Sequence, residues 1–248
     1  AELVLEALTG AGDVNGRYAA GYLFHTGRIS QLLPGASTCL DIGAAPGGQI
    51  LQVAALHPNV QFIGVDNCPI LLEHARTATK ALSLSNVEWI EDDIRQLQKI
   101  PSDSVDAVIS TMTLHYLPDL ISINQALASV NRVITPGGAL YIEDFARLKS
   151  SLSMDYFNLK NAPAERDAFI ELNGYALHAA FTLEELKGAC AKHLQNMKFC
   201  SNFLIPFLNF AKTEDRDIHA ALKEKLSEMR LALNRAQRPD LDELSKFF

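Results

Sequence analysis

Three aspartates spread along the chain could hold the polar groups of one nucleotide-type cofactor. Asp41 stands just before a loop of small residues, and a carboxylate there would repel a pyrophosphate but attract a cationic amino or sulfonium group. Asp66 follows roughly 20 residues after the loop begins, the spacing at which an acid accepts from a pair of ribose hydroxyls. Asp93, with Ile94 as its apolar neighbour, could accept from an exocyclic amine such as that of adenine. The alternatives are an Asp41 that caps the loop and a solvated acidic turn at residues 91–93.

The loop after Asp41 is built so that backbone can approach a ligand closely. An apolar run typical of a buried strand ends at Ile42, and the residues that follow are almost without side chains: Gly43, Ala44, Ala45, Gly47 and Gly48. Residues 50–56 then have the pattern of a helix, whose first turn would aim free N–H groups at a bound group. Strand, loop and helix together predict a nucleotide-type cofactor site. With one substitution the loop also meets a Gly-x-Gly-x-x-Gly pattern, so an NAD-dependent oxidoreductase stays an alternative.

The elements that must position these residues alternate between strand and helix. Buried strands are predicted at residues 38–41, 59–65 and 87–90, and helices at residues 69–82 and 122–133. This alternation predicts an α/β fold with a doubly wound, mainly parallel sheet. Thr182 and Glu185 form a capping box that starts a helix over residues 182–193. Two strands at 197–206 and 207–212 would then complete the sheet as an antiparallel hairpin.

These segments resemble the motifs of the class I S-adenosylmethionine-dependent methyltransferases. The segment DIGAAPGG is similar to the first motif of that family, with Ala45 where a central glycine is common. Asp66 matches the ribose-binding acid, and WIEDDIRQL carries the adenine-binding acid Asp93, with Asp92 where a glycine is usual. Residues 104–119 and 132–144 resemble the fourth strand with its following turn and the fifth strand. The matches occur in order over residues 36–146, which makes the resemblance specific.

The resemblance implies a fold, a cofactor and a reaction. The fold is a Rossmann-like, seven-stranded sheet with an antiparallel last strand, and the cofactor is S-adenosylmethionine, with S-adenosylhomocysteine as product. The expected reaction is methyl transfer to oxygen, nitrogen or an activated carbon of a small molecule, as in the enzymes of ubiquinone and menaquinone biosynthesis. A non-enzymatic alternative stays open, in which a methyltransferase-like domain binds the cofactor or has lost it and acts as a partner protein through its C-terminal helix. The implied cofactor-binding residues are Asp41, Gly43, Ala44, Ala45, Gly47, Asp66, Asn67, Asp92, Asp93, Ile94 and Thr111.

A general base is needed only if the methyl acceptor must lose a proton. His115, in the turn after the fourth strand, is the first candidate because histidine titrates near neutral pH. His178 and Tyr175 are second candidates, and Glu143 and Asp144 at the end of the fifth strand are third. The structural alternative for His115 is that it packs or caps its turn. No acids and histidines stand at ligand spacing, so no metal site is predicted.

Five regions are expected along the chain. Residues 1–35 form an N-terminal helical cap, 36–146 the cofactor-binding core, 147–181 a helical lid that holds the substrate, 182–212 the end of the core, and 213–248 a C-terminal helical extension. The lid is rich in aromatic residues, which could line an acceptor pocket or simply pack: Tyr156, Phe157, Phe169 and Tyr175. The extension has an apolar stripe from Leu222 to Leu233, and Pro239 is expected to end its helix. The stripe would dock on the same chain or form a homodimer, so a monomer or homodimer is expected.

Composition agrees with an ordinary globular protein that acts on a small molecule. The 248 residues are 48% hydrophobic and carry a net charge of −7. No run of Lys and Arg offers the cationic face that nucleic acid requires, so no nucleic-acid partner is expected. No apolar run approaches the ~20 residues of a membrane span, and no leader pattern is found, so neither membrane insertion nor export is expected. The four cysteines lack paired spacing, which favours a reducing cytoplasm.

Overall fold

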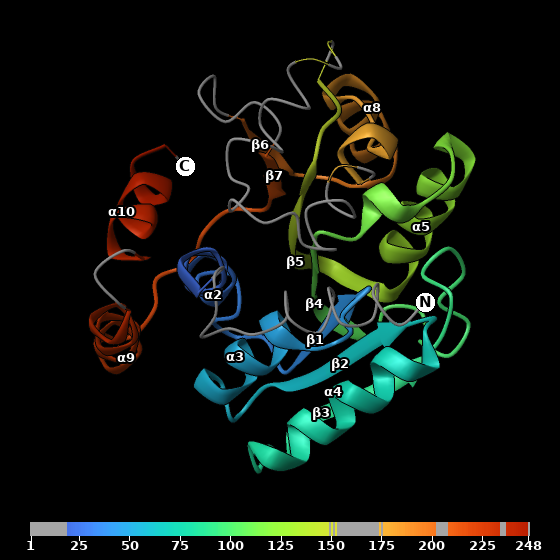
Figure 1. Ribbon diagram of the computed structural model, residues 1–248. Coiled ribbons are helices and arrows are strands. Elements are labelled where there is room, and N and C mark those ends of the chain that lie inside the picture. Colours follow the sequence, from blue (N-terminus) through green and yellow to red (C-terminus); the bar gives the residue numbers. More distant parts are fainter. Residues whose placement is uncertain are drawn as a thin grey trace.

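The computed structural model describes residues 19–148, 150, 152, 174, 176–201, 208–233 and 237–247 of the chain. Strands and helices alternate over most of its length (Figure 1). The strands are β1 (Thr38–Ile42), β2 (Gln61–Asp66), β3 (Val87–Glu91), β4 (Val105–Thr111), β5 (Ile134–Phe145), β6 (Lys198–Ser201) and β7 (Leu208–Lys212). The helices are α2 (Ala19–Ser30), α3 (Gly48–Leu56), α4 (Pro69–Ala81), the short 3-10 turn η1 (Leu114–Tyr116), α5 (Leu120–Val133), α8 (Leu183–His193), α9 (Ala220–Ala232) and α10 (Gln237–Phe247).

The strands form one seven-stranded sheet in the order β3-β2-β1-β4-β5-β7-β6. The pairs among β1 to β5 are parallel, whereas β7 runs antiparallel to both β5 and β6. This order confirms the predicted doubly wound sheet and its antiparallel end. The strand order reverses between β1 and β4, and ligands of such sheets bind at the carboxyl ends of the strands at that reversal. The predicted acids of β1, β2 and β5 all lie at this edge.

Helices cover both faces of the sheet. The apolar side chains of α2, α3 and α4 pack with Cys39, Phe62 and Ile109 on one face, and those of α5 and α8 pack with Leu40, Val108 and Leu140 on the other. The pattern follows from the period of two along each strand, which sends alternate side chains to opposite faces. Both layers can be followed in Figure 1.

The C-terminal helices α9 and α10 lie beside α2 (Figure 1). Leu233 and Leu241 belong to the same apolar cluster as α2, so the predicted docking on the same chain is confirmed for these helices. The prediction that Pro239 ends a helix is wrong. Helix α9 ends at Ala232. Pro239 lies in the first turn of the next helix, α10, where a missing N–H costs no helical hydrogen bond.

Three polar side chains tie together the backbone near the amino ends of the strands. The Asn86 amide donates to three carbonyls at 3.0 to 3.2 Å, and Arg132 donates to three others at 2.7 to 3.1 Å. The Asp106 carboxylate accepts from two N–H groups at 2.8 and 3.1 Å. Their backbone partners are Ala54, His57 and Val60 for Asn86, Gln96, Leu97 and Ile100 for Arg132, and Ser37 and Thr38 for Asp106.

Helix caps account for two of the predicted boundaries. The capping box before α8 is confirmed: the Glu185 N–H donates to the Thr182 hydroxyl at 3.2 Å, and the Thr182 N–H donates to the Glu185 carboxylate at 2.7 Å. Helix α5 begins at Leu120, two residues earlier than predicted, because Asp119 serves as its N-cap and accepts from the Ser122 N–H at 2.7 Å. In the part of the chain that is described, no helix is long and apolar enough to cross a membrane.

Candidate functional site

The small-residue loop turns sharply at two glycines. Gly43 has a φ of +67°, and a Cβ atom there would lie 2.1 Å from Cγ2 of Thr113. Only glycine suits a position with both a positive φ and so close a neighbour. Gly47 has a φ of +107° and caps α3 without any side-chain hydrogen bond. The first turn of α3 therefore presents its N–H groups without a competing side chain, as the sequence predicted.

Asp66 stands at the end of β2 and reaches back to the loop. Its Oδ2 atom accepts from the Ala45 N–H at 3.3 Å, and its Oδ1 atom accepts from the Cys68 N–H at 2.9 Å. Burial raises the pKa of Asp66 above its usual value, and these backbone hydrogen bonds oppose the rise. The next residue, Asn67, is exposed beside it. The structure thus brings the predicted ribose acid to the loop.

Asp41 is the most deeply buried acid of the loop, with 2% of its surface exposed. Within the described residues its Oδ1 atom has no hydrogen-bond partner. Burial and the nearby charge of Asp66 raise the pKa of Asp41 well above its usual value. Buried polar atoms are nearly always satisfied, so this oxygen calls for a donor or a cation that the described residues do not supply. A cationic cofactor fits that requirement.

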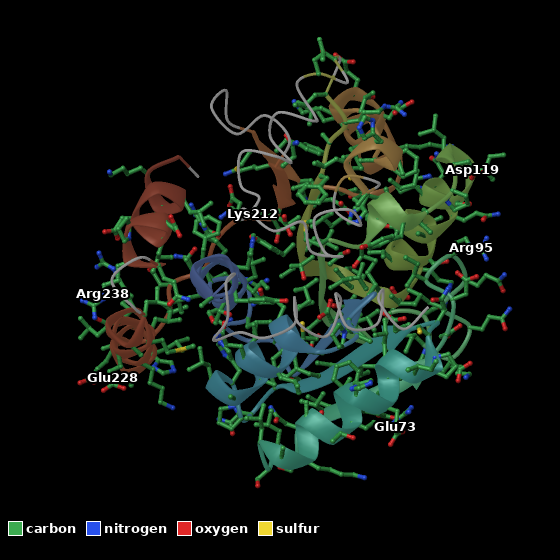
Figure 2. All side chains as sticks on the ribbon, in the orientation of Figure 1. Glu73, Arg95, Asp119, Lys212, Glu228 and Arg238 are labelled. Atoms are coloured by element: carbon green, nitrogen blue, oxygen red, sulfur yellow. The ribbon has the colours of Figure 1, made fainter. Side chains whose placement is uncertain are left out.

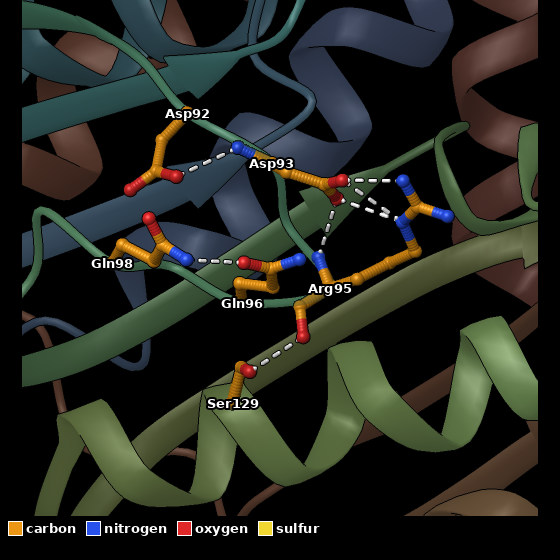
Figure 3. Close-up of polar contacts among 6 residues, drawn as sticks. All are labelled: Asp92, Asp93, Arg95, Gln96, Gln98 and Ser129. Carbon is orange, nitrogen blue, oxygen red and sulfur yellow. Dashed lines mark hydrogen bonds and ion pairs between the residues drawn. The ribbon is translucent and has the colours of Figure 1, made fainter.

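Asp93 is engaged by a neighbour that the sequence analysis missed. Its carboxylate accepts from the Arg95 backbone N–H at 2.9 Å and from the guanidinium at 2.5 to 3.0 Å (Figure 3). This pairing lowers the pKa of Asp93. Asp92 accepts from the N–H groups of Asp93 and Lys99, at 2.8 and 2.7 Å, so it shapes the turn.

The Asp93 pair lies at the surface near the start of α5. Arg95 is found beside Asp119, which also favours its charged form (Figure 2). Ile94 is half-buried and packs on the apolar cluster under α5, and its contact with an adenine ring stays a prediction. An adenine amine at Asp93 would share the carboxylate with Arg95, since a carboxylate has about four acceptor positions. The spacing Asp-x-Arg was the signal available in the sequence.

The turn after β4 joins the cofactor loop to β5. The Thr113 hydroxyl donates to the carbonyls of Gly43 and Thr111 at 3.3 and 3.2 Å. Met112 adopts a positive φ of +56°, and its N–H donates to the Glu143 carbonyl at 2.9 Å. These contacts hold the predicted residue Thr111 at the loop, and they fix where the chain continues into η1.

His115, in η1, is paired with Asp144 at the end of β5. Its Nδ1 atom lies 2.6 Å from Asp144 Oδ1, and its backbone N–H donates to Oδ2 at 3.2 Å. The imidazole is 3% exposed, and among the described residues its Nε2 atom has no partner. The rings of Tyr116 and Phe145 lie 4.1 and 5.4 Å away, measured between centroids. Sequence reasoning treated the histidine and the acid as separate candidates, whereas the fold joins them.

Glu143 is a second buried acid in this region, 1% exposed, and its Oε2 atom lacks a hydrogen-bond partner within the described chain. Burial and the charge of Asp144 raise the pKa of Glu143 well above its usual value. Neighbouring residues of a strand point to opposite faces, so Glu143 and Asp144 face different sides of the sheet. The two carboxyl groups therefore have different nearest neighbours.

Of the two base candidates in the predicted lid, only His178 lies within the described residues. Tyr175 lies outside the described residues, as do Tyr156, Phe157 and Phe169. His178 is exposed, whereas its neighbours Ala176, Leu177 and Ala180 are buried against Phe145. In the described ranges no group of three or more His, Cys, Asp or Glu side chains is arranged to hold a metal ion.

Comparison with known proteins agrees with this geometry. A model of a family described as "Methyltransferase domain" matches residues 35–223, from the end of the cap to α9. The chain belongs to this family. The match confirms the resemblance read from the motifs, and S-adenosylmethionine is the cofactor that the resemblance implied. A crystal structure of an S-adenosylmethionine-dependent methyltransferase from Aquifex aeolicus has the same fold, with a TM-score of 0.59 and 15% identity over 80% of this chain and 93% of that one.

Curated relatives are similar over part of their length. A tRNA (guanine-N(7)-)-methyltransferase from Chloroflexus aggregans is 32% identical over 50% of this chain and 60% of its own. A demethylmenaquinone methyltransferase from Deinococcus radiodurans is 32% identical over 48% of each. The chain thus spans less than two thirds of either relative, and their two acceptors differ in kind. These matches establish the shared domain and leave the acceptor of this chain open.

Proposed function

We propose that this protein binds S-adenosylmethionine and transfers its methyl group to a small molecule. The observation that carries the proposal is the meeting of Asp41, Asp66 and the Gly43 turn at one edge of the sheet, with a buried carboxylate oxygen left for a ligand. The Asp41 carboxylate suits a cationic cofactor and disfavours a pyrophosphate, which argues against the dinucleotide alternative.

Each residue of the site has a distinct part in this proposal. The cofactor, when bound, supplies an electrophilic methyl group on a positively charged sulfur. Asp66 would accept from its ribose hydroxyls and Asp93 from its adenine amine, while Asp41 would face its cationic end. The N–H groups of the loop and of α3 would bind through the backbone. The protein then has to align acceptor and methyl group and to exclude water.

A small acceptor is supported by the charge of the chain. The net charge of −7 and the lack of a Lys/Arg run in the sequence disfavour a nucleic-acid acceptor. The similarity to a demethylmenaquinone methyltransferase supports an acceptor of the quinone-precursor type. All four cysteines are free, which supports a reducing compartment such as the cytoplasm.

Calorimetry with S-adenosylhomocysteine tests the cofactor half of the proposal. Replacing Asp66→Ala should weaken binding by roughly 1 to 3 kcal/mol, about 5- to 150-fold, because a charge-assisted pair to the ribose is lost. Glu91→Ala is the matched control, since Glu91 is an exposed acid at the end of the adjacent strand β3. Failure of the wild-type protein to bind at millimolar ligand would overturn the proposal. Equal affinities of wild type and Asp66→Ala would refute the role given to Asp66.

A further inference from the structure

We propose that His115 is the general base of the reaction, and that the acceptor is an apolar molecule methylated at a hydroxyl group which His115 deprotonates. This inference rests on the proposed function, because it needs a methyl donor in the adjacent site. It narrows the acceptor from any small molecule to one whose reacting atom carries a proton. Alcohols and phenols meet that condition, whereas carboxylates and thioethers do not need a base.

The hydrogen bonds of Asp144 fix the tautomer of His115. The Asp144 carboxylate accepts from the backbone N–H of His115 at 3.2 Å and from the Phe145 N–H at 2.7 Å. Its Oδ1 atom lies 2.6 Å from Nδ1, and a carboxylate can only accept, so the ring proton sits on Nδ1. In the neutral imidazole the lone pair is then on Nε2. A neutral imidazole with a free Nε2 lone pair and an acid behind Nδ1 is the arrangement that accepts a proton.

The turn that carries His115 is tied to the small-residue loop, and aromatic rings surround the imidazole. Thr113, two residues earlier, donates to the Gly43 carbonyl, so the η1 turn is tied to the loop that would hold the cofactor. The rings of Tyr116 and Phe145 flank the imidazole, and Met112 packs on the same cluster as Phe145. An apolar acceptor would contact these rings while its hydroxyl meets Nε2.

A half-exposed ring lies against the buried histidine: Tyr116 is 55% exposed, and its ring centroid is 4.1 Å from that of His115. Exposed side chains change rotamer within nanoseconds. The proposal requires that the Tyr116 ring and its neighbours move so that a small acceptor reaches Nε2.

Glu143 is the competing base, and its chemistry differs. The titratable groups beside the imidazole are Asp144 from β5 and the phenol of Tyr116, whereas Glu143, the preceding residue of β5, points to the other face of the sheet. Burial and the charge of Asp144 raise the pKa of Glu143 well above its usual value, which favours its protonated form. A protonated carboxyl group can donate a hydrogen bond to an acceptor, but it cannot remove a proton from it.

The proton and the electron pair each have a defined destination in the methyl transfer. Nε2 takes the hydroxyl proton, the acceptor oxygen forms a bond to the methyl carbon, and the bond between that carbon and sulfur breaks. The sulfur keeps the electron pair of that bond, which turns the sulfonium into the neutral thioether of S-adenosylhomocysteine. The products are a methyl ether and an imidazolium that Asp144 stabilises.

The experiment compares phenols of different acidity, with methyl-tritiated S-adenosylmethionine as donor. Phenol, 1-naphthol and 4-nitrophenol are the probes, and the last is measured at a pH above its own pKa, where it needs no base. His115→Asn keeps an N–H donor toward Asp144 but removes Nε2. His74→Asn, an exposed histidine of α4, is the matched control. We expect His115→Asn to lower kcat/KM for phenol and 1-naphthol about 10²- to 10⁴-fold and for ionised 4-nitrophenol far less.

The outcomes separate this inference from the proposed function. Equal losses for all three phenols would mean a structural role for His115 and would overturn the inference. So would a wild-type protein that binds S-adenosylhomocysteine but methylates none of the phenols. A wild-type protein that does not bind S-adenosylhomocysteine would instead refute the proposed function itself. Because a variant can fail to fold, NMR of ¹⁵N-histidine-labelled wild type gives a second test: the proton must be on Nδ1 of His115, and the opposite tautomer contradicts the inference.

Discussion

The substitution Asp41→Asn should make the ligand-free protein more stable at neutral pH. It should also lower the affinity of the protein for the cofactor. The Asp41 carboxyl is 2% exposed, one of its oxygens has no partner within the described residues, and Asp66 stands near it. An amide of almost the same shape removes the buried charge and its repulsion by Asp66. The same change removes the attraction for a cationic cofactor.

The magnitude follows from the extra cost of burying a charged rather than a neutral polar group, about 1 to 3 kcal/mol. For a chain of this length, each kcal/mol changes Tm by about 2 to 4 °C, so Asp41→Asn should raise Tm by roughly 2 to 12 °C. The pH dependence has a definite sign. Folding raises the pKa of Asp41, so the cost of its charge is absent below the ordinary pKa of about 3.9 and grows as pH rises toward the folded value. The advantage of the variant should therefore be present at pH 7 and vanish near pH 4.

Thermal unfolding of both proteins from pH 4 to pH 8, with and without S-adenosylhomocysteine, measures these effects. Asp106→Asn is the matched control, because the Asp106 carboxylate accepts from two backbone N–H groups and its replacement should lower Tm. A variant at position 41 that is less stable than wild type at pH 7 would refute the reasoning. So would an advantage that does not change with pH, or an unchanged gain in Tm on addition of ligand.

Two further substitutions test the loop and the scaffold. Gly43→Ala should destabilise the protein by more than the ~1 to 3 kcal/mol of a positive φ alone, because the new Cβ atom would clash with Thr113. Gly137→Ala is the control for the φ effect, since Gly137 has a φ of +78° and open space around it. Equal losses of stability in urea unfolding would argue against the steric contact. Asn86→Ala should cost about 1 to 3 kcal/mol, since three carbonyls lose their donor, while leaving affinity for S-adenosylhomocysteine unchanged; an unaltered urea midpoint would contradict this.

The features predicted from the sequence are those encoded locally. Strand and loop at Asp41, the acid after β2 and the capping box at Thr182 each depend on residues within one short segment. Their positions in the structure match the expectation, with strand ends that differ by one or two residues. The prediction that Pro239 ends a helix was wrong because a proline is also favourable in the first turn of a helix. The local sequence pattern does not distinguish these two positions.

The features missed depend on residues that are distant along the chain or on a choice between partners. His115 and Asp144 are joined only because β4 and β5 are neighbours in the sheet. The three carbonyls held by Asn86 belong to α3 and to the loop after it, 26 to 32 residues earlier in the chain. For Asp93, the sequence showed an acid but not that Arg95 would turn back onto it. Sequence spacing identifies the candidate polar side chains. Which of them form hydrogen bonds with each other depends on how the backbone folds.

The two edges of the sheet differ in how their polar groups are paired. At the amino ends of the strands, Asn86, Asp106 and Arg132 satisfy backbone groups of several segments at once. At the carboxyl ends, atoms of Asp41, His115 and Glu143 are buried without a partner from the described chain. Replacing one of these three atoms thus breaks no hydrogen bond within the described chain. We expect that acceptor preference can drift over generations at this end while the other keeps the domain folded, which suits one scaffold to many methylation reactions.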